Sequence, residues 1–189
     1  MNLMLFGAPG AGKGTQADFL KHKYNLVHLS TGDIFRFNIK NDTELGRLAK
    51  TFMDKGDLVP DEVTIQMLQS EVDKNPHSAG FLFDGFPRTL AQAEALDKFL
   101  ESKGQSITAT VALEADDNIL VARLLERGKT SGRPDDQDEE KIRNRYQEYN
   151  EKTAPLMDYY KAQNKFYAVD GIGSIQEVTE RLSLVLDQL

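Results

Sequence analysis

The first fifteen residues contain the pattern that most directly suggests chemistry. A short apolar run, residues 2–6, precedes the segment Gly7-Ala-Pro-Gly-Ala-Gly-Lys-Gly-Thr15, and a helical pattern follows. This order of strand, glycine turn and helix is the context of a phosphate-binding loop, because glycines let backbone N–H groups surround an anion. Lys13 can then reach the outer phosphates and Thr15 can bind Mg²⁺, although the hydroxyl comes one place later than in the general pattern. The alternative is a strand-to-helix turn whose glycines serve only close packing.

The composition indicates an ordinary globular protein with one domain. The chain has 189 residues, 40% hydrophobic and 28% charged, with no cysteine and a net charge of -7. These values predict a single domain over residues 1–189, exclude disulfides and thiolate zinc sites, and argue against nucleic acid or a membrane surface as a partner. No segment reaches the length of a membrane span, and no basic leader opens the chain, so the expected location is cytoplasmic.

The positive charges gather in a way that suits anionic ligands. Several arginines fall within or beside motif-like stretches, whereas the lysines other than Lys13 are scattered. The planar guanidinium suits bidentate phosphate contacts, so this division is chemically sensible. The arginines in question are Arg36, Arg88, Arg123, Arg127, Arg133 and Arg145.

A second short strand, Leu26–Leu29, is followed by Ser30-Thr-Gly-Asp33. One interpretation is that Ser30, Thr31 or Asp33 caps a helix from Ile34 to Lys40. The other interpretation is that this loop binds a second substrate and that Arg36 binds the phosphate of that substrate. The two interpretations are compatible. Residues 41–59 have the spacing of a small helical insert.

The strand Phe81–Phe83 ends in Asp84, where parallel α/β sheets place ligand groups. Its carboxylate could hold Mg²⁺ through water, or Asp84 could be a simple turn residue. Thr89-x-x-Gln92 fits a capping box for a helix that runs to about Lys103. Gln92 could equally point its amide at a base edge, although the spacing alone slightly favours the cap.

Residues Gly128–Asp136 form a polar segment of hinge-like composition, which could be a lid or an ordinary loop. Two further strands, Ile107–Leu113 and Phe166–Val169, complete a set of five that alternates with helices. Ser174-x-x-Glu177 marks a capping box for the last helix. The alternation predicts a parallel sheet covered on both faces, an α/β fold with two polar inserts near residues 30–59 and 126–136.

Taken together, the motifs resemble adenylate kinases of the short-lid type, within the nucleoside monophosphate kinase family. The matching stretches are Gly7–Thr15, Leu29–Arg36, Gly56–Pro60, Asp84–Thr89, Arg127–Asp136 and the helix that holds Arg145. The resemblance implies a P-loop three-layer α/β/α fold with a five-stranded parallel sheet. It also implies that residues 30–59 bind the monophosphate and that residues 126–136 form a short lid.

The resemblance implies reversible Mg²⁺-dependent transfer of a phosphoryl group from ATP to AMP, giving two ADP. The implied ATP-binding residues are Gly10, Ala11, Gly12, Lys13, Gly14, Thr15, Arg123, Arg127 and Gly173. The implied AMP-binding residues are Thr31, Arg36, Asp57, Leu58, Val59, Gly85, Phe86, Pro87, Arg88, Gln92, Arg133 and Arg145. The implied catalytic cations are Lys13, Arg36, Arg88, Arg127, Arg133 and Arg145, and the implied Mg²⁺ ligands are Thr15 and Asp84. Because zinc-bearing lids use cysteines, no zinc is expected, and the enzyme is expected to be a monomer.

Two other functions stay open at this point. A uridylate/cytidylate kinase would share the fold, but such relatives tend to have Ala at the position of Thr31. A nucleotide-binding switch without transfer activity would need an Asn-Lys-x-Asp base reader. The nearest segment, Asn164-Lys-Phe-Tyr167, lacks the aspartate.

Overall fold

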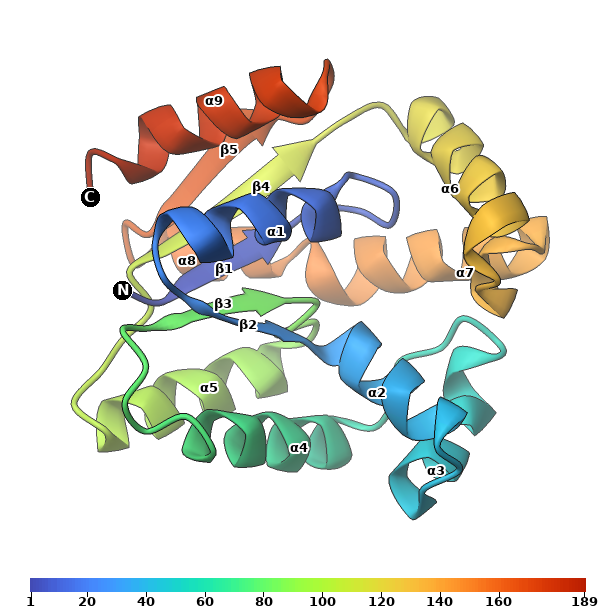
Figure 1. The fold of residues 1–189 in the computed structure, drawn as a ribbon, viewed down its shortest axis with the longest axis horizontal. Helices are drawn as coiled ribbons and strands as arrows, with labels where there is room; N and C mark the ends of the chain where they lie inside the picture. Colours follow the sequence, from blue (N-terminus) through green and yellow to red (C-terminus); the bar gives the residue numbers. More distant parts are fainter.

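In the computed structural model, apolar runs form a five-stranded parallel sheet in the order β2-β3-β1-β4-β5 (Figure 1). The structure describes residues 1–189, apart from the side chains of Asp117 and Pro134. The strands are β1 (Leu3–Phe6), β2 (Val27–Ser30), β3 (Phe81–Asp84), β4 (Ala109–Glu114) and β5 (Phe166–Asp170). The predicted α/β fold with a five-stranded parallel sheet is therefore confirmed. All five strands run the same way, so the loops at their carboxyl ends meet at one edge of the sheet.

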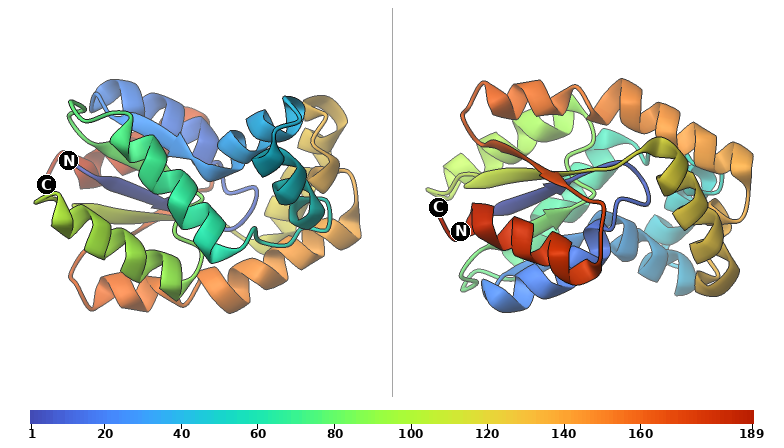
Figure 2. Two further views of the ribbon diagram at one scale, coloured as in Figure 1. Left: turned by 90° about the horizontal axis from the view of Figure 1, so that it is seen from below. Right: turned by 90° about the horizontal axis from the view of Figure 1, so that it is seen from above.

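Helices cover both faces of this sheet (Figure 2). They are α1 (Lys13–Lys23), α2 (Thr31–Lys40), α3 (Glu44–Met53), α4 (Asp61–Asp73), α5 (Leu90–Ser102), α6 (Asp117–Ser131), α7 (Glu139–Glu148), α8 (Leu156–Lys161) and α9 (Ile175–Leu186). A 3₁₀ turn at Pro134–Asp136 and a π-helical turn at Tyr149–Thr153 complete the regular elements. No helix among the described residues is long and apolar enough to cross a membrane.

The core divides into two layers because side chains alternate along each strand. Leu3 and Leu5 of β1 pack with α1, α6, α7 and α9 in one hydrophobic cluster. Met4 and Phe6 pack with α4, α5 and α8 in the other. Burial on both faces explains why β1 is apolar at every position rather than at alternate positions.

The insert formed by α2 and α3 has a small core of its own. Phe35, Ala49 and Val59 are buried with Met67 of α4. Gly46 allows α2 and α3 to cross closely, since a Cβ there would lie 2.1 Å from the carbonyl oxygen of Asn38. The insert therefore stands beside the sheet on α4, at the carboxyl ends of the strands (Figure 1).

Two predicted helix caps are confirmed, and one predicted loop is helical over its first turn. Ser30 caps α2, which begins at Thr31 rather than at Ile34, and Ser174 with Glu177 forms the expected capping box. The first four residues of the expected loop, 128–131, are instead the last turn of α6, and the irregular segment begins at Gly132. Gly128 permits close packing rather than a hinge, because a Cβ there would lie 2.4 Å from the carbonyl oxygen of Asp136.

Candidate functional site

The loop between β1 and α1 leaves the amino end of α1 open to a ligand. Gly12 takes the left-handed conformation at φ 91°, and no side chain caps the helix or places an acid in its first turn. The unpaired N–H groups of a helix start and the helix dipole favour an anion at this position. Lys13 Nζ donates to the carbonyl oxygens of Gly7 at 2.7 Å and Ala8 at 3.2 Å. The Lys13 side chain thus lies against the loop that would bind the phosphates.

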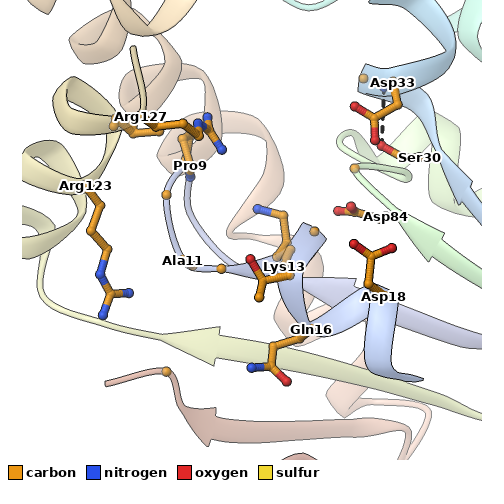
Figure 3. Close-up of a pocket in the computed structure, with 18 of the residues that line it drawn as sticks. Pro9, Ala11, Lys13, Gln16, Asp18, Ser30, Asp33, Asp84, Arg123 and Arg127 are labelled. Carbon is orange, nitrogen blue, oxygen red and sulfur yellow. Dashed lines mark hydrogen bonds between the residues drawn. The ribbon is translucent and has the colours of Figure 1, made fainter. Parts of the chain in front are cut away.

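A cavity of about 990 Å³ opens above this loop. Figure 3 shows Lys13 near its centre, with Arg123 and Asp33 on opposite sides. The phosphate loop, the amino end of α2, the end of β3, α6 and α7 all contribute to its walls. Its lining includes the predicted residues Gly10, Ala11, Gly12, Lys13, Gly14, Thr15, Arg36, Asp84, Gly85, Arg88, Arg123, Arg127, Arg133, Arg145 and Gly173. Residues distant in sequence are therefore brought to one cavity.

Aspartates that the sequence interpretation did not assign to the site hold several of its arginines. The side chain of Asp136 is fully buried and accepts from Arg127 at 2.6 and 3.0 Å and from Arg145 at 2.6 Å. Asp135 also pairs with Arg145, at 2.8 Å. Burial alone would raise the pKa of Asp136, but the two arginines hold it below its usual value. These ion pairs could not be predicted from sequence spacing, because they join three different elements: α6, the 3₁₀ turn and α7.

A second aspartate lies between the insert and the lid segment. Asp33 accepts from Arg36 at 2.5 Å and lies 3.5 Å from Arg133. Burial opposes ionisation of Asp33, but the Arg36 and Arg133 guanidiniums keep its pKa below the ordinary value. For Arg133, burial and the nearby positive charges of other arginines lower the pKa.

Lys13 and Arg88 have less compensation for their charge. Burial is the main cause that lowers the pKa of Lys13 from 10.5 to about 8 and that of Arg88 from 12.5 to about 10. Neighbouring arginines lower both pKa values further, and Asp84 opposes this only in part. The site therefore holds cations that lack enough negative charge, which is the electrostatic condition for binding a polyanion.

Asp84 is nearly buried at the end of β3, and its Oδ2 lies 3.5 Å from His28 Nε2. Burial would raise the pKa of Asp84, but His28 and the charges of Lys13 and Arg88 lower it overall. The hydroxyl of Thr15 and the Asp84 carboxylate are oxygen donors, which suit Mg²⁺ completed by phosphate oxygens and water. Among the described residues, no group of three or more His, Cys, Asp or Glu side chains could hold a metal ion alone.

A small cavity of about 40 Å³ adjoins the main one and shares Gly32, Gly85 and Arg88 with it. Its walls include the predicted residues Thr31, Asp57, Leu58, Val59 and Gln92. The Thr31 hydroxyl donates to the Gly85 carbonyl oxygen at 2.8 Å, so Thr31 does not cap α2. Val59 also packs in the core of the insert.

Gln92 fits only half of the predicted capping box. Its N–H donates to Thr89 Oγ1 at 3.2 Å, as the cap requires. Its side-chain Oε1, however, accepts from the N–H of Arg88 at 2.8 Å rather than from Thr89, and its Nε2 donates to Asp61 Oδ1 at 2.8 Å. The amide therefore occupies the wall of the small cavity instead of closing the helix end.

Two predicted residues lie apart from these walls. The ring of Phe86 is buried in the core cluster around β3 and α5, so only its backbone is available to a ligand. Pro87 lines a different cavity, of about 70 Å³, together with Lys13, Arg88 and Arg145. The sequence pattern gave no means of separating these two residues from their neighbours in the same motif.

Comparisons with known proteins agree with this geometry. A family profile described as adenylate kinase matches residues 5–165. The chain is 80% identical to an adenylate kinase of Flavobacterium psychrophilum and 76% identical to one of Flavobacterium johnsoniae, each over the whole of both chains. An adenylate kinase of Bacteroides thetaiotaomicron is 46% identical, again over the full length of both. A phosphate loop beneath a cluster of arginines and a match along the whole chain thus lead to one conclusion: the chain belongs to the adenylate kinase family.

Proposed function

We propose that this enzyme transfers the γ-phosphoryl group of Mg·ATP reversibly to AMP, giving two ADP. The observation that carries the proposal is one cavity of about 990 Å³, in which a phosphate loop with Lys13 faces the arginines of α2, the loop after β3, α6, the segment at residue 133 and α7. The phosphates of ATP and AMP would supply the negative charge that balances these cations. In this proposal residues 30–59 bind the monophosphate and residues 126–136 form the lid.

Catalysis would rest on position and charge rather than on a proton acceptor. A phosphate oxygen of AMP is already nucleophilic, so no general base is required. Lys13 and Arg88, both half-buried at the centre, would stabilise the transferring group, and Arg36 would hold the phosphate of AMP. The described walls of the cavity would also keep water from the γ-phosphate once the lid closes.

The remaining arginines would exchange partners when nucleotides bind. Arg127 and Arg145 share the buried carboxylate of Asp136, and Arg133 lies near Asp33. Two oxygens of a tetrahedral phosphate can accept the paired N–H groups of a guanidinium, as the two oxygens of a carboxylate do. The aspartates would thus hold the guanidiniums in place until phosphates replace them.

Mg²⁺ bound with ATP would neutralise charge on the phosphate oxygens, and Thr15 and Asp84 are the residues that would hold it, Asp84 through water. We propose that the enzyme acts as a monomer. We place the enzyme in the cytoplasm, where ATP, ADP and AMP are exchanged.

A coupled assay of ATP with AMP, UMP and CMP tests the proposal. We expect a strong preference for AMP, with Gln92→Ala narrowing it by at least about tenfold, or roughly 1.4 kcal/mol. Removal of a base contact raises KM for AMP selectively, whereas loss of a cap destabilises the protein and affects all acceptors alike. A wild-type preference for UMP or CMP would overturn the adenylate assignment. An equal loss of kcat/KM for all three acceptors in Gln92→Ala, with a lower Tm, would show that Gln92 does not contact the base.

A further inference from the structure

The side-chain amide of Gln92 is held in one orientation by two contacts of opposite chemistry. The backbone N–H of Arg88 is a donor and can only meet the amide oxygen, at 2.8 Å. The carboxylate of Asp61 is an acceptor and can only meet the amide nitrogen, at 2.8 Å. Rotating the amide by 180° would turn both hydrogen bonds into repulsive contacts. Gln92 is 2% exposed, so water cannot compensate for them.

The fixed amide still has one hydrogen and one lone pair unused. A primary amide has two N–H donors and two acceptor lone pairs, and the two contacts occupy one of each. Gln92 lines the small cavity, whereas Asp61 is absent from the lining residues that the structure describes. We therefore expect the remaining donor and acceptor to be available to the cavity, with their positions fixed by the Asp61 carboxylate together with the N–H of Arg88.

The relative positions of the amide donor and acceptor can distinguish between two types of purine. Adenine presents a 6-amino donor beside the N1 acceptor, and hypoxanthine presents a 6-oxo acceptor beside an N1–H donor. The two bases are nearly identical in shape, so exclusion by size cannot separate them. An amide that is free to rotate would pair with either edge, but one that is held fixed pairs with only one.

We infer that Asp61 sets the selectivity of the acceptor site for a 6-amino over a 6-oxo purine, by fixing the orientation of Gln92. The inference rests on the proposed function, in which Gln92 reads the acceptor base. Asp61 acts here as a positioning residue, because it contacts Gln92 and not the base. A hydrogen bond to a charged carboxylate is stronger than one between neutral groups, so its removal is expected to have a measurable effect.

The test compares AMP with IMP as acceptors for wild type, Asp61→Asn and Glu62→Gln. An asparagine at this position can donate or accept, so the flipped amide would meet one repulsive contact, with the N–H of Arg88, instead of two. Glu62→Gln is the matched control: Glu62 is exposed and belongs to the same first turn of α4, so both variants remove one carboxylate from the same helix start. The quantity measured is the ratio of kcat/KM for AMP to kcat/KM for IMP, in one sample of each protein. A smaller folded fraction in a variant cancels from this ratio.

We expect the ratio to fall about tenfold in Asp61→Asn, or ~1.4 kcal/mol, mainly through a lower KM for IMP, and to stay within about twofold of wild type in Glu62→Gln. An unchanged ratio in Asp61→Asn, or the same change in both variants, would overturn the role of Asp61. If Asp61→Asn does not accumulate, Asp61→Ser makes the same test, since serine can also donate or accept. The two hypotheses can fail separately. A wild type without preference for AMP over UMP and CMP contradicts the proposed function. A wild type that prefers AMP, together with an AMP-to-IMP ratio that is unchanged in Asp61→Asn, contradicts only this inference.

Discussion

Replacing Lys13 with methionine should stabilise the unliganded protein while it abolishes turnover. Burial lowers the pKa of Lys13 from 10.5 to about 8. At 1.36 kcal/mol per pKa unit, this shift corresponds to a cost of about 3 kcal/mol for keeping the lysine charged below pH 8. The variant also loses two hydrogen bonds to loop carbonyls, worth about 1 kcal/mol each. The expected net gain in the free energy of unfolding is therefore roughly 1–2 kcal/mol, or about 2–8 °C in Tm.

The pH dependence supplies a second, independent measurement. Between about pH 8 and 10.5 the unfolded chain binds the Lys13 proton and the folded chain does not. Stability consequently rises with pH in that interval as the penalty disappears. Urea unfolding of wild type at pH 7.5 and pH 10 should show this rise in the free energy of unfolding. In Lys13→Met the rise should be smaller by the part that comes from deprotonation of Lys13.

Lys21→Met is the control for this experiment. Lys21 lies on the same helix and pairs with Asp18 at the surface, so its loss should change stability by less than about 0.5 kcal/mol and should leave the pH response intact. The reasoning would be refuted if Lys13→Met were less stable than wild type at pH 7.5 and kept the wild-type response between pH 7.5 and 10. Turnover with ATP and AMP, measured beside the melts, separates the functional loss from the gain in stability.

Three further predictions address other parts of the site. Arg88→Ala should lower kcat roughly 10³-fold or more with a Tm near that of wild type, and an early melt with normal turnover would show a structural role instead. A strong chelator should leave the Tm of the unliganded protein unchanged while activity stops, and a large fall in Tm would reveal a structural metal site. Asp136→Asn should cost about 1–3 kcal/mol at pH 7, because Arg127 and Arg145 lose a charged partner. Since the pKa of Asp136 is lowered in the folded state, this stabilisation should vanish as urea melts are taken to acid pH, and a difference that persists at pH 2 would contradict the ion-pair account.

The sheet and the helix starts could be predicted because they depend on short stretches of sequence. The run from Leu3 to Phe6 is apolar at each position, as burial on both faces requires. Ser174 and Glu177 satisfy each other within one turn, so their spacing was sufficient evidence. The end of α6 could not be predicted in this way. Gly128 breaks the local pattern although α6 continues to Ser131, and the close approach of the Asp136 backbone explains why this position has no side chain.

The candidate site was predictable where one motif supplies several residues, as in the phosphate loop. It was not predictable where a side chain depends on distant partners. Asp136 joins two helices nine residues away on either side, and nothing in the sequence distinguishes it from Asp135 or Asp138. Gln92 has the spacing of a capping residue, but its amide is held by Arg88 and by Asp61, thirty-one positions away. Spacing predicts contacts within one element and gives no account of contacts between elements.

The distribution of counter-charges gives the cavity two electrostatic parts. At its edges, Asp33 and Asp136 neutralise arginines of the insert, the lid segment and α7. At its centre, Asp84 for Lys13 and Asp84 with Asp135 for Arg88 offset only in part the lowering of their pKa values by burial and neighbouring arginines. A phosphate chain at the centre would therefore gain interactions at no cost of broken ion pairs, whereas one at the edge must first displace a carboxylate. This difference predicts that inorganic tripolyphosphate stabilises wild type chiefly through the centre: Lys13→Met should lose most of the rise in Tm that tripolyphosphate gives, and Asp33→Asn should keep or increase it. A full rise in Lys13→Met, measured over a tripolyphosphate titration, would show that the edge arginines carry the binding instead.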